Sequence, residues 1–314
     1  MEDNSGAPVS AAFSHESVIS YRFPEAIYSY TERDAAIYAL GIGACGRDAV
    51  EPAELKFVYH ENGQDYIQVL PTFSTVFIPG SLLYDLDLPG LKYDQQLLLH
   101  GQQYIEIYQP LPARATVINR LSLAGLHDKG KAAIIEIEVK SFDAKSEELL
   151  CMNRFTIYLR GAGGFSKSSH AYSYSNYSSK KAAVVKIPET SPTVVFTDTT
   201  QQSQALLYRL SGDYNPLHSD PETATAAGFH RPILHGLCTL GFAVRAIIRC
   251  VLNGDATLVK SISSRFLLHV FPGETLITEM WVEGLRVIYQ TKVKERDRAV
   301  LSGYVDCHRK PSRL

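Results

Sequence analysis

The segment Asp213-Tyr-Asn-Pro-Leu-His218 contains the residue types that acid–base chemistry requires. A carboxylate and an imidazole stand five positions apart in it, and the surrounding glycine and prolines exclude a regular helix. We therefore expect a structured loop that turns both side chains toward one point, where they could hold a water molecule, with Asn215 as a third polar anchor. The spacing alone also fits Asp213 as a loop cap and His218 as a structural histidine.

Gly236 is the second candidate, because it lies near the N-terminus of an apolar run that predicts a buried helix over residues 234–252. The first N–H groups of a helix lack intrahelical acceptors and carry partial positive charge, so they could stabilise a developing oxyanion. A glycine at this position could equally serve only to let the helix pack closely. The sequence leaves both interpretations open.

A metal site is the third hypothesis, suggested by His230, His235 and Cys238. Their spacing fits no standard zinc pattern, and neither a carboxylate nor a second cysteine pair accompanies them. We therefore predict no metal and no cofactor.

The elements that must position these groups are read from residue periodicity. Partial alternation of β-branched and aromatic residues predicts antiparallel strands at 134–139, 155–159, 275–281, 287–293 and 299–305. Each half is expected to wrap such a sheet around one long helix, and Gly254 is expected to end the helix of the second half. The predicted fold class is thus α+β.

Two diverged copies of one unit are suggested by short internal matches. Residues 35–40 align with 205–210, and Leu98-Leu-His100 aligns with Leu267-Leu-His269 at nearly the same offset. A Gly-, Ser- and Tyr-rich stretch with few aliphatic residues lies between the copies and is typical of a linker or long loop. We therefore predict a first repeat over 1–165, a linker over 166–192 and a second repeat over 193–314.

Composition excludes several classes of function. The 314 residues include 45% hydrophobic and 20% charged side chains with a net charge of −2, which argues against nucleic acid or an anionic membrane as partner. No apolar run is long enough to span a bilayer, and the acidic N-terminus does not resemble a secretory signal. Five scattered cysteines favour free thiols in a reducing compartment.

The run Tyr208-Arg-Leu-Ser-Gly-Asp-Tyr-Asn-Pro-Leu-His-Ser-Asp-Pro221, followed by Arg231-Pro-Ile-Leu-His-Gly-Leu-Cys-Thr239, resembles hydratase 2. This family is the (R)-specific 2-enoyl-CoA hydratase of the MaoC-like hot-dog group. In the first half Tyr30-Thr-Glu-Arg-Asp34, Leu99-His-Gly101 and Asp128-Lys-Gly130 resemble its first repeat. The resemblance covers nearly the whole chain and implies a two-repeat (double) hot-dog fold. Because the chain lacks a Gly-rich nucleotide-binding fingerprint, it resembles the free-standing form of the family.

The resemblance also implies roles at matching positions. It makes Asp213, His218, Asn215 and Gly236 catalytic. It places the acyl-CoA against a further set of residues: His100, Gly101, Lys129, Tyr214, Pro216, Leu217 and Phe266. Alignment of the repeats puts Gly43 opposite Asp213 and Asp48 opposite His218. The first repeat therefore lacks the acid–base pair and is expected to accommodate a long acyl chain.

The implied reaction is reversible hydration of trans-2-enoyl-CoA to (3R)-3-hydroxyacyl-CoA in fatty-acid β-oxidation, with coenzyme A entering as part of the substrate. A homodimer is expected by resemblance. The tripeptide Ser312-Arg313-Leu314 resembles the C-terminal address read by the peroxisomal import receptor, which predicts a peroxisomal location. The alternatives are a hot-dog acyl-CoA thioesterase and a non-catalytic acyl-CoA-binding protein.

Overall fold

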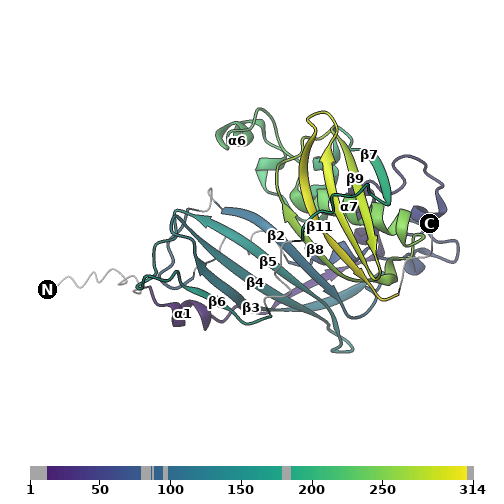
Figure 1. The fold of residues 1–314 in the computed structure, drawn as a ribbon. Coiled ribbons are helices and arrows are strands. Elements are labelled where there is room, and N and C mark those ends of the chain that lie inside the picture. Colours follow the sequence, from purple (N-terminus) through teal and green to yellow (C-terminus); the bar gives the residue numbers. More distant parts are fainter. Residues whose placement is uncertain (1–12, 79–85, 87, 95–97, 179–184, 310–314) are drawn as a thin grey trace.

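The computed structural model describes residues 13–78, 86, 88–94, 98–178 and 185–309. Its main feature is one antiparallel sheet with the strand order β1-β3-β4-β5-β2-β8-β11-β10-β9-β7, to which β6 adds by pairing with β3 (Figure 1). The strands are β1 (Ala26–Tyr30), β2 (Leu98–Ile107), β3 (Ala115–Asp128), β4 (Ala132–Asp143), β5 (Leu149–Arg160), β6 (Ser173–Ser175), β7 (Val194–Thr199), β8 (Val259–Phe266), β9 (Thr275–Glu283), β10 (Arg286–Val293) and β11 (Arg298–Cys307).

The two halves of the strand order are equivalent. Counted inward from either edge, each half has its first, third, fourth, fifth and second strand in that order. Strands β1 to β5 form one half and β7 to β11 form the other, and the halves join where β2 pairs with β8. All five strands predicted from sequence lie within β4, β5, β9, β10 and β11. The internal duplication and the antiparallel sheet are therefore confirmed.

One internal match, between residues 98–100 and 267–269, does not join equivalent positions of the two repeats. Leu98 to His100 open β2, whereas Leu267 to His269 follow the end of β8. Because β2 and β8 are antiparallel, with Gln102 opposite Arg265, both triplets lie at the same end of the seam. They are thus neighbours across the seam between the repeats, and they do not occupy corresponding positions.

The long helix of the second half is α7 (Gly236–Val251), as predicted, and Gly254 ends it by donating its N–H to the carbonyl of Ile248 at 2.8 Å. It is buried on most sides, packed against the curved sheet (Figure 1). The other helices are α1 (His15–Ile19), α2 (Glu32–Gly41), α3 (Pro52–Leu55), α5 (Gln204–Tyr208) and α6 (Pro221–Ala226), with 3₁₀ turns η1 (Gln64–Tyr66), η2 (Pro71–Val76), η5 (Arg209–Ser211), η6 (Pro216–His218) and η7 (Ala256–Leu258). Over the residues described, none of these helices is long and apolar enough to cross a membrane.

A long central helix is not found among the described residues of the first half. The longest there is α2, with 10 residues, and the stretch before β2 contains the 3₁₀ turn η2, which opens with Pro71. The β-branched residues Thr72, Thr75 and Val76 disfavour a continuous α-helix in this stretch, whereas Pro71 stands at the first position, where proline is tolerated. Helix α2 packs beside α5 instead, where Gln204 Nε2 donates to the carbonyl of Gly41 at 2.7 Å.

The segment predicted as a linker packs partly onto the first-half sheet. Strand β6 pairs with β3, and Tyr177 donates its hydroxyl to Glu136 at 2.6 Å. The N–H and hydroxyl of Ser166 both donate to the carboxylate of Asp128. The polar composition of this segment did not reveal these contacts, because they depend on acidic groups elsewhere in the chain. The proposed division at 165 and 193 stays a prediction.

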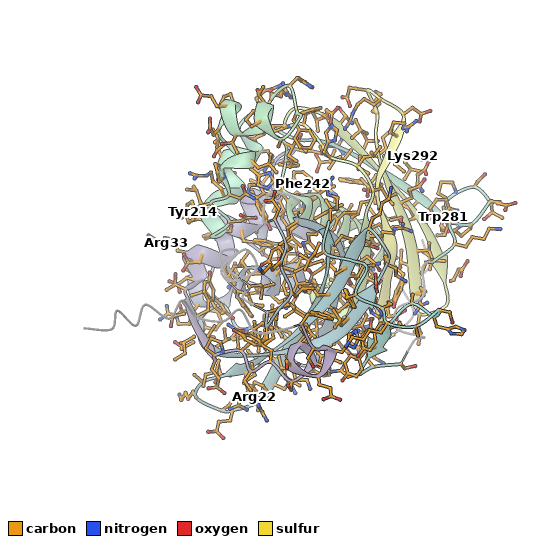
Figure 2. The ribbon with its side chains drawn as sticks, turned by 90° about the vertical axis from the view of Figure 1, so that its left-hand side faces the viewer. Arg22, Arg33, Tyr214, Phe242, Trp281 and Lys292 are labelled. Atoms are coloured by element: carbon orange, nitrogen blue, oxygen red, sulfur yellow. The ribbon has the colours of Figure 1, made fainter. Side chains whose placement is uncertain are left out.

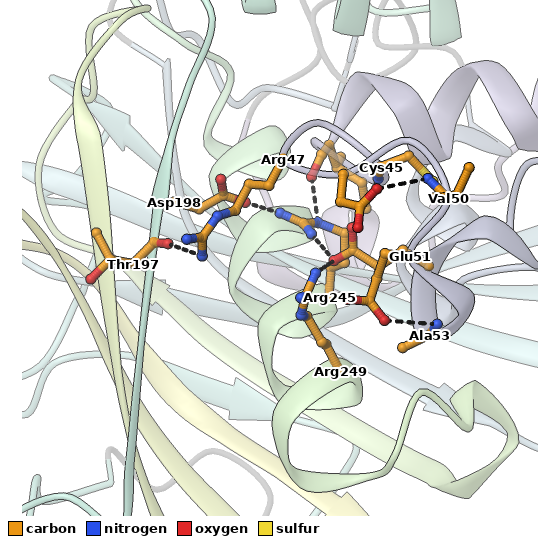
Figure 3. A network of polar contacts seen from close by, with 12 residues as sticks. Cys45, Arg47, Val50, Glu51, Ala53, Thr197, Asp198, Arg245 and Arg249 are labelled. Carbon is orange, nitrogen blue, oxygen red and sulfur yellow. Dashed lines mark hydrogen bonds and ion pairs between the residues drawn. The ribbon is translucent and has the colours of Figure 1, made fainter.

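A buried ion network links the loop after α2 to the second half (Figure 3). Arg245, on α7 and 1% exposed, pairs with Glu54 and Asp198 and donates to the carbonyl of Ile42. A buried charge is tolerated only when it is paired and hydrogen-bonded. Gly43 permits this packing, since a Cβ there would lie 2.5 Å from the ring of Phe242.

Candidate active site

The loop that carries Asp213 is held by its own polar groups. Gly212 precedes it with a φ of 120°, which favours glycine. The N–H of Asn215 donates to the Asp213 carboxylate at 3.2 Å, and the Asn215 side chain accepts from the N–H of Leu217 at 3.0 Å. The 3₁₀ turn η6 then brings His218 back toward the core. A structured loop forms here, as the sequence predicts.

His218 is buried, with 9% of its surface exposed. Its Nδ1 lies 2.8 Å from the carbonyl oxygen of Ile233. A carbonyl can only accept, so Nδ1 carries a proton and the neutral ring presents Nε2 as a base. Burial lowers the pKa of His218, against the opposing effect of the Asp213 carboxylate. The imidazole is therefore neutral near pH 7.

His235 is the neighbour that the sequence did not place in the catalytic set. Its ring stacks on that of His218 with centroids 3.7 Å apart, and its Nε2 lies 3.2 Å from the backbone carbonyl of Asp213. The side chain is 1% exposed, and burial followed by the charge of His218 lowers its pKa well below the ordinary value. Its position directly before Gly236 is the sequence signal that could have identified it.

Asp213, His218 and His235 each offer one ligand atom, and these atoms lie within 4.8 Å of one another. The two imidazoles lie one above the other, so their in-plane lone pairs do not point toward a common centre. This geometry is poor for a shared metal ion. His230 is exposed, and the thiol of the buried Cys238 lies 3.4 Å from the carbonyl of Gly41. Neither joins this group.

Gly236 is the first residue of α7, with His235 as the N-cap. Its N–H has no intrahelical acceptor by position, and the residue is exposed to solvent. A Cβ at this position would lie 3.2 Å from the ring of Phe266. The glycine thus lets the end of β8 approach the helix terminus closely.

A cavity of about 80 Å³ lies between the two halves, beside Asp213. It is lined from the first half by Thr75, Val76, Ile78, Leu98, His100, Phe155 and Ile157, and from the second by Tyr208, Ser211, Gly212, Asp213 and Leu237. Most of the first-half lining is apolar, which fits an acyl chain. The sequence did not identify the second-half lining residues other than Asp213.

His100 lines this cavity and packs against Phe266. Their ring centroids lie 4.9 Å apart, and the ring of Phe155 lies 5.5 Å from His100 on another side. Burial lowers the pKa of His100 to about 4, against opposing hydrogen bonds that include Nε2 on the carbonyl of Gln102 at 3.0 Å. The structure therefore brings together His100, Phe266, Gly236 and the Asp213 loop.

Gly101 and Lys129 have different surroundings. Gly101 lies at a β-bulge of β2, where a Cβ would lie 2.3 Å from the ring of Tyr158, so packing alone requires glycine. Lys129 is exposed in the hairpin between β3 and β4. The strand register runs from Asp128 through β4 and β5 to Leu98, so the hairpin lies at the cavity end of the first-half sheet.

The remaining predicted contacts lie on the surface of the loop. Tyr214 lies at the edge of the molecule (Figure 2). Its side chain is 58% exposed, and the guanidinium of Arg209 lies 4.9 Å from its ring centroid. Pro216 is exposed and Leu217 is half-buried. None of these three lines the cavity, so they could contact only a part of the substrate outside it.

Comparison with known proteins finds matches for both halves of the chain. Residues 28–161 match the MFE-2 hydratase 2 N-terminal domain, and residues 183–303 match the MaoC-like domain. A peroxisomal enoyl-CoA hydratase 2 from Arabidopsis thaliana is 68% identical over 94% of this chain and 95% of its own length. A MaoC-like dehydratase structure from Phytophthora capsici is 30% identical, with a TM-score of 0.81 over 95% of this chain and 98% of its own.

A third neighbour concerns the fold alone. A Mycobacterium tuberculosis protein with a double hot-dog fold is 14% identical over 91% of this chain and 96% of its own, with a TM-score of 0.54. The strand order and the neighbours together define a MaoC-like protein of the double hot-dog class. Within that class, the chain belongs to the enoyl-CoA hydratase 2 family. The expected fold and family are thus confirmed.

Proposed function

We propose that this protein is a hydro-lyase that reversibly adds water to trans-2-enoyl-CoA and yields the (3R)-3-hydroxyacyl-CoA. The observation that carries the proposal is the meeting of Asp213 and His218 beside a cavity next to the N-terminus of α7. Two hydrogen bonds of about 2.8 Å from one water span about 4.6 Å. The Asp213 and His218 atoms lie within 4.8 Å of each other, so one water could bridge them.

In this mechanism Nε2 of His218 removes a proton from the bridging water while the hydroxyl adds to C3 of the enoyl group. The Asp213 carboxylate orients the water through its other O–H, and His218 returns a proton to C2. The negative charge that develops on the thioester oxygen accepts a hydrogen bond from the N–H of Gly236. Because one water serves both carbons, both additions occur on the same face. No cofactor is needed beyond the coenzyme A of the substrate.

The remaining contacts extend the proposal to the whole substrate. The first half accommodates the acyl chain, and Lys129 binds a phosphate of the coenzyme A at the cavity end of the sheet. A homodimer and peroxisomal import through Ser312-Arg313-Leu314 also belong to the proposal, and residues 312–314 lie outside the described part of the chain. A peroxisomal role in fatty-acid β-oxidation accords with the 68% identical relative, which is named peroxisomal.

The proposal is tested by incubating the protein with trans-2-decenoyl-CoA and resolving the product on a chiral column. The (3R)-hydroxy product is expected. A (3S) product would contradict the assignment, release of free thiol would favour a thioesterase, and binding without any product would favour a carrier. Asp213→Asn and His218→Gln should each lower kcat by about 10²- to 10⁴-fold with the fold intact.

A further inference from the structure

His235 occupies the point at which the proposed catalytic groups meet. It directly precedes Gly236, its ring lies 3.7 Å from that of His218, and its Nε2 lies 3.2 Å from the backbone carbonyl of Asp213. Since that carbonyl can only accept, Nε2 carries a proton and donates it. The His235 side chain therefore contacts both the backbone of Asp213 and the ring of His218.

The helix fixes the position of His235 independently of these contacts. Its backbone carbonyl accepts from the N–H of Thr239 at 3.1 Å, and the ring centroid of Tyr208 lies 4.8 Å from that of His235. A backbone contact of this kind does not require an imidazole, because any residue at the N-cap supplies a carbonyl. The ring and its donor are therefore additional features, directed toward the loop that carries Asp213.

The charge of His235 also suits the chemistry of its neighbour. Its side chain is 1% exposed and stays neutral near pH 7, because burial and the adjacent His218 both oppose protonation. When His218 takes up the proton from water, the stacked pair holds one positive charge rather than two. That charge lies close to the Asp213 carboxylate, which favours the protonated form of His218.

We propose that His235 is a positioning residue, which rests on the proposed function. It ties the Asp213 loop and the His218 ring to the first turn of α7, so that the base, the carboxylate and the Gly236 N–H keep one relative geometry. Catalytic groups held this way need no reorganisation during the reaction. Loss of the tie should therefore lower kcat much more than it raises KM.

Two variants separate the two contacts of the imidazole. His235→Phe keeps a ring against His218 and loses the donor, whereas His235→Gln keeps an N–H donor and loses the ring. His230→Phe is the matched control, since His230 lies in the same segment, is exposed and packs on Phe271. Hydration of trans-2-decenoyl-CoA is followed over a range of pH, together with the Tm of each variant.

We expect His235→Phe and His235→Gln each to lower kcat by about tenfold or more, with KM changed by less than about threefold. The acidic limb of the kcat profile should also shift, because the neighbour of His218 has changed, while His230→Phe behaves as the wild type. Wild-type kcat and an unshifted limb in both variants would overturn the proposal. The proposal would also be overturned if unfolded protein accounted for all of the lost activity and the folded fraction kept the wild-type kcat. A wild-type protein without hydratase activity would instead refute the proposed function.

Discussion

The ring of His100 on β2 lies 4.9 Å from that of Phe266 on β8, and these two strands join the halves of the sheet. The ring of Phe266 is also close to Gly236, where an added Cβ would lie 3.2 Å from it. The first repeat thus reaches the N-terminus of α7 through two aromatic rings. It forms one wall of the cavity even though the proposed acid–base pair, Asp213 and His218, comes entirely from the second repeat.

The role of the Gly236 N–H can be isolated with two substitutions at that position. Gly236→Ala adds a Cβ and keeps the N–H, whereas Gly236→Pro adds a comparable Cβ and removes it. Proline is well tolerated at the first position of a helix, and His235 before it has the extended backbone that a following proline requires (φ −59°, ψ 136°). Both variants should therefore fold.

We expect kcat of Gly236→Pro to fall about 10²- to 10³-fold below that of Gly236→Ala, as is typical when one oxyanion donor is removed. Steady-state hydration kinetics of the two purified variants would measure this ratio. Gly236→Ala itself should lose some activity by crowding Phe266, and adding Phe266→Leu should restore part of it. Equal kcat values for the alanine and proline variants would mean that this N–H does not bind the oxyanion.

Much of the fold could be predicted because local periodicity determines it. The strands within β9, β10 and β11 and the apolar helix α7 can be recognised from their own residue patterns, without knowing which segment each packs against. The loop at Asp213 was likewise predictable, since glycine and proline exclude regular structure. The triplet at His100 was placed wrongly against the second repeat because three residues can match by chance, and only the strand register shows where they lie.

Other features depend on contacts that no local pattern encodes. The neutral stack of His218 and His235 arises because the loop after Gly212 folds back onto the start of α7. The first half has no long helix among its described residues, and the stretch Pro71–Val76, which was predicted only as part of a repeat, forms a 3₁₀ turn instead. The local sequence therefore indicates the loop at Asp213 and the helix α7 more readily than the contacts that bring them together.

Lys129 should affect binding rather than catalysis. It is exposed in the β3–β4 hairpin, whose shape is fixed by Asp128, which accepts hydrogen bonds from the N–H groups of Gly130 at 2.8 Å and Gly164 at 2.9 Å. Lys129→Gln should raise KM for trans-2-decenoyl-CoA several-fold and leave kcat nearly unchanged, with a weaker dependence of KM on salt. A shortened thioester without the nucleotide phosphates serves as the control. An effect of equal size on that substrate would argue against a phosphate contact.

His100 makes a predictable contribution to the pH dependence of stability. Its folded pKa is about 4, below the ordinary value of 6.5, so the unfolded state binds a proton between these values while the folded state does not. Stability from this group is therefore complete above pH 6.5 and is lost as the pH falls toward 4. In His100→Gln the free energy of unfolding should depend less on pH in this window, by at most about 1.4 kcal/mol per pH unit. Urea unfolding at a series of pH values measures the slope, and an unchanged slope would contradict the prediction.

Disrupting the ion network of Arg245 should lower the free energy of unfolding more than disrupting any other charged contact of the described residues. Arg245→Met fills a similar volume but leaves Glu54 and Asp198 buried without their main cation, although Arg249 still lies 3.2 Å from Glu54. Breaking a buried pair in this way typically costs about 3–5 kcal/mol of the free energy of unfolding. Removal of the exposed Arg33, whose side chain is 81% exposed, should cost far less.

The triple variant Arg245→Met, Asp198→Asn and Glu54→Gln separates loss of charge balance from loss of packing. Because the neutral amides no longer need a cation, the triple variant should be more stable than Arg245→Met alone, even though it carries more substitutions. Burial already raises the pKa of Asp198, and Arg245 opposes this effect, so in Arg245→Met the pKa should rise further. The difference in the free energy of unfolding between the wild type and Arg245→Met should therefore become smaller as the pH is lowered and Asp198 takes up a proton. Urea unfolding of the three proteins at neutral and acidic pH tests both statements. A triple variant less stable than Arg245→Met would show that packing, rather than buried charge, dominates this part of the interface between the repeats.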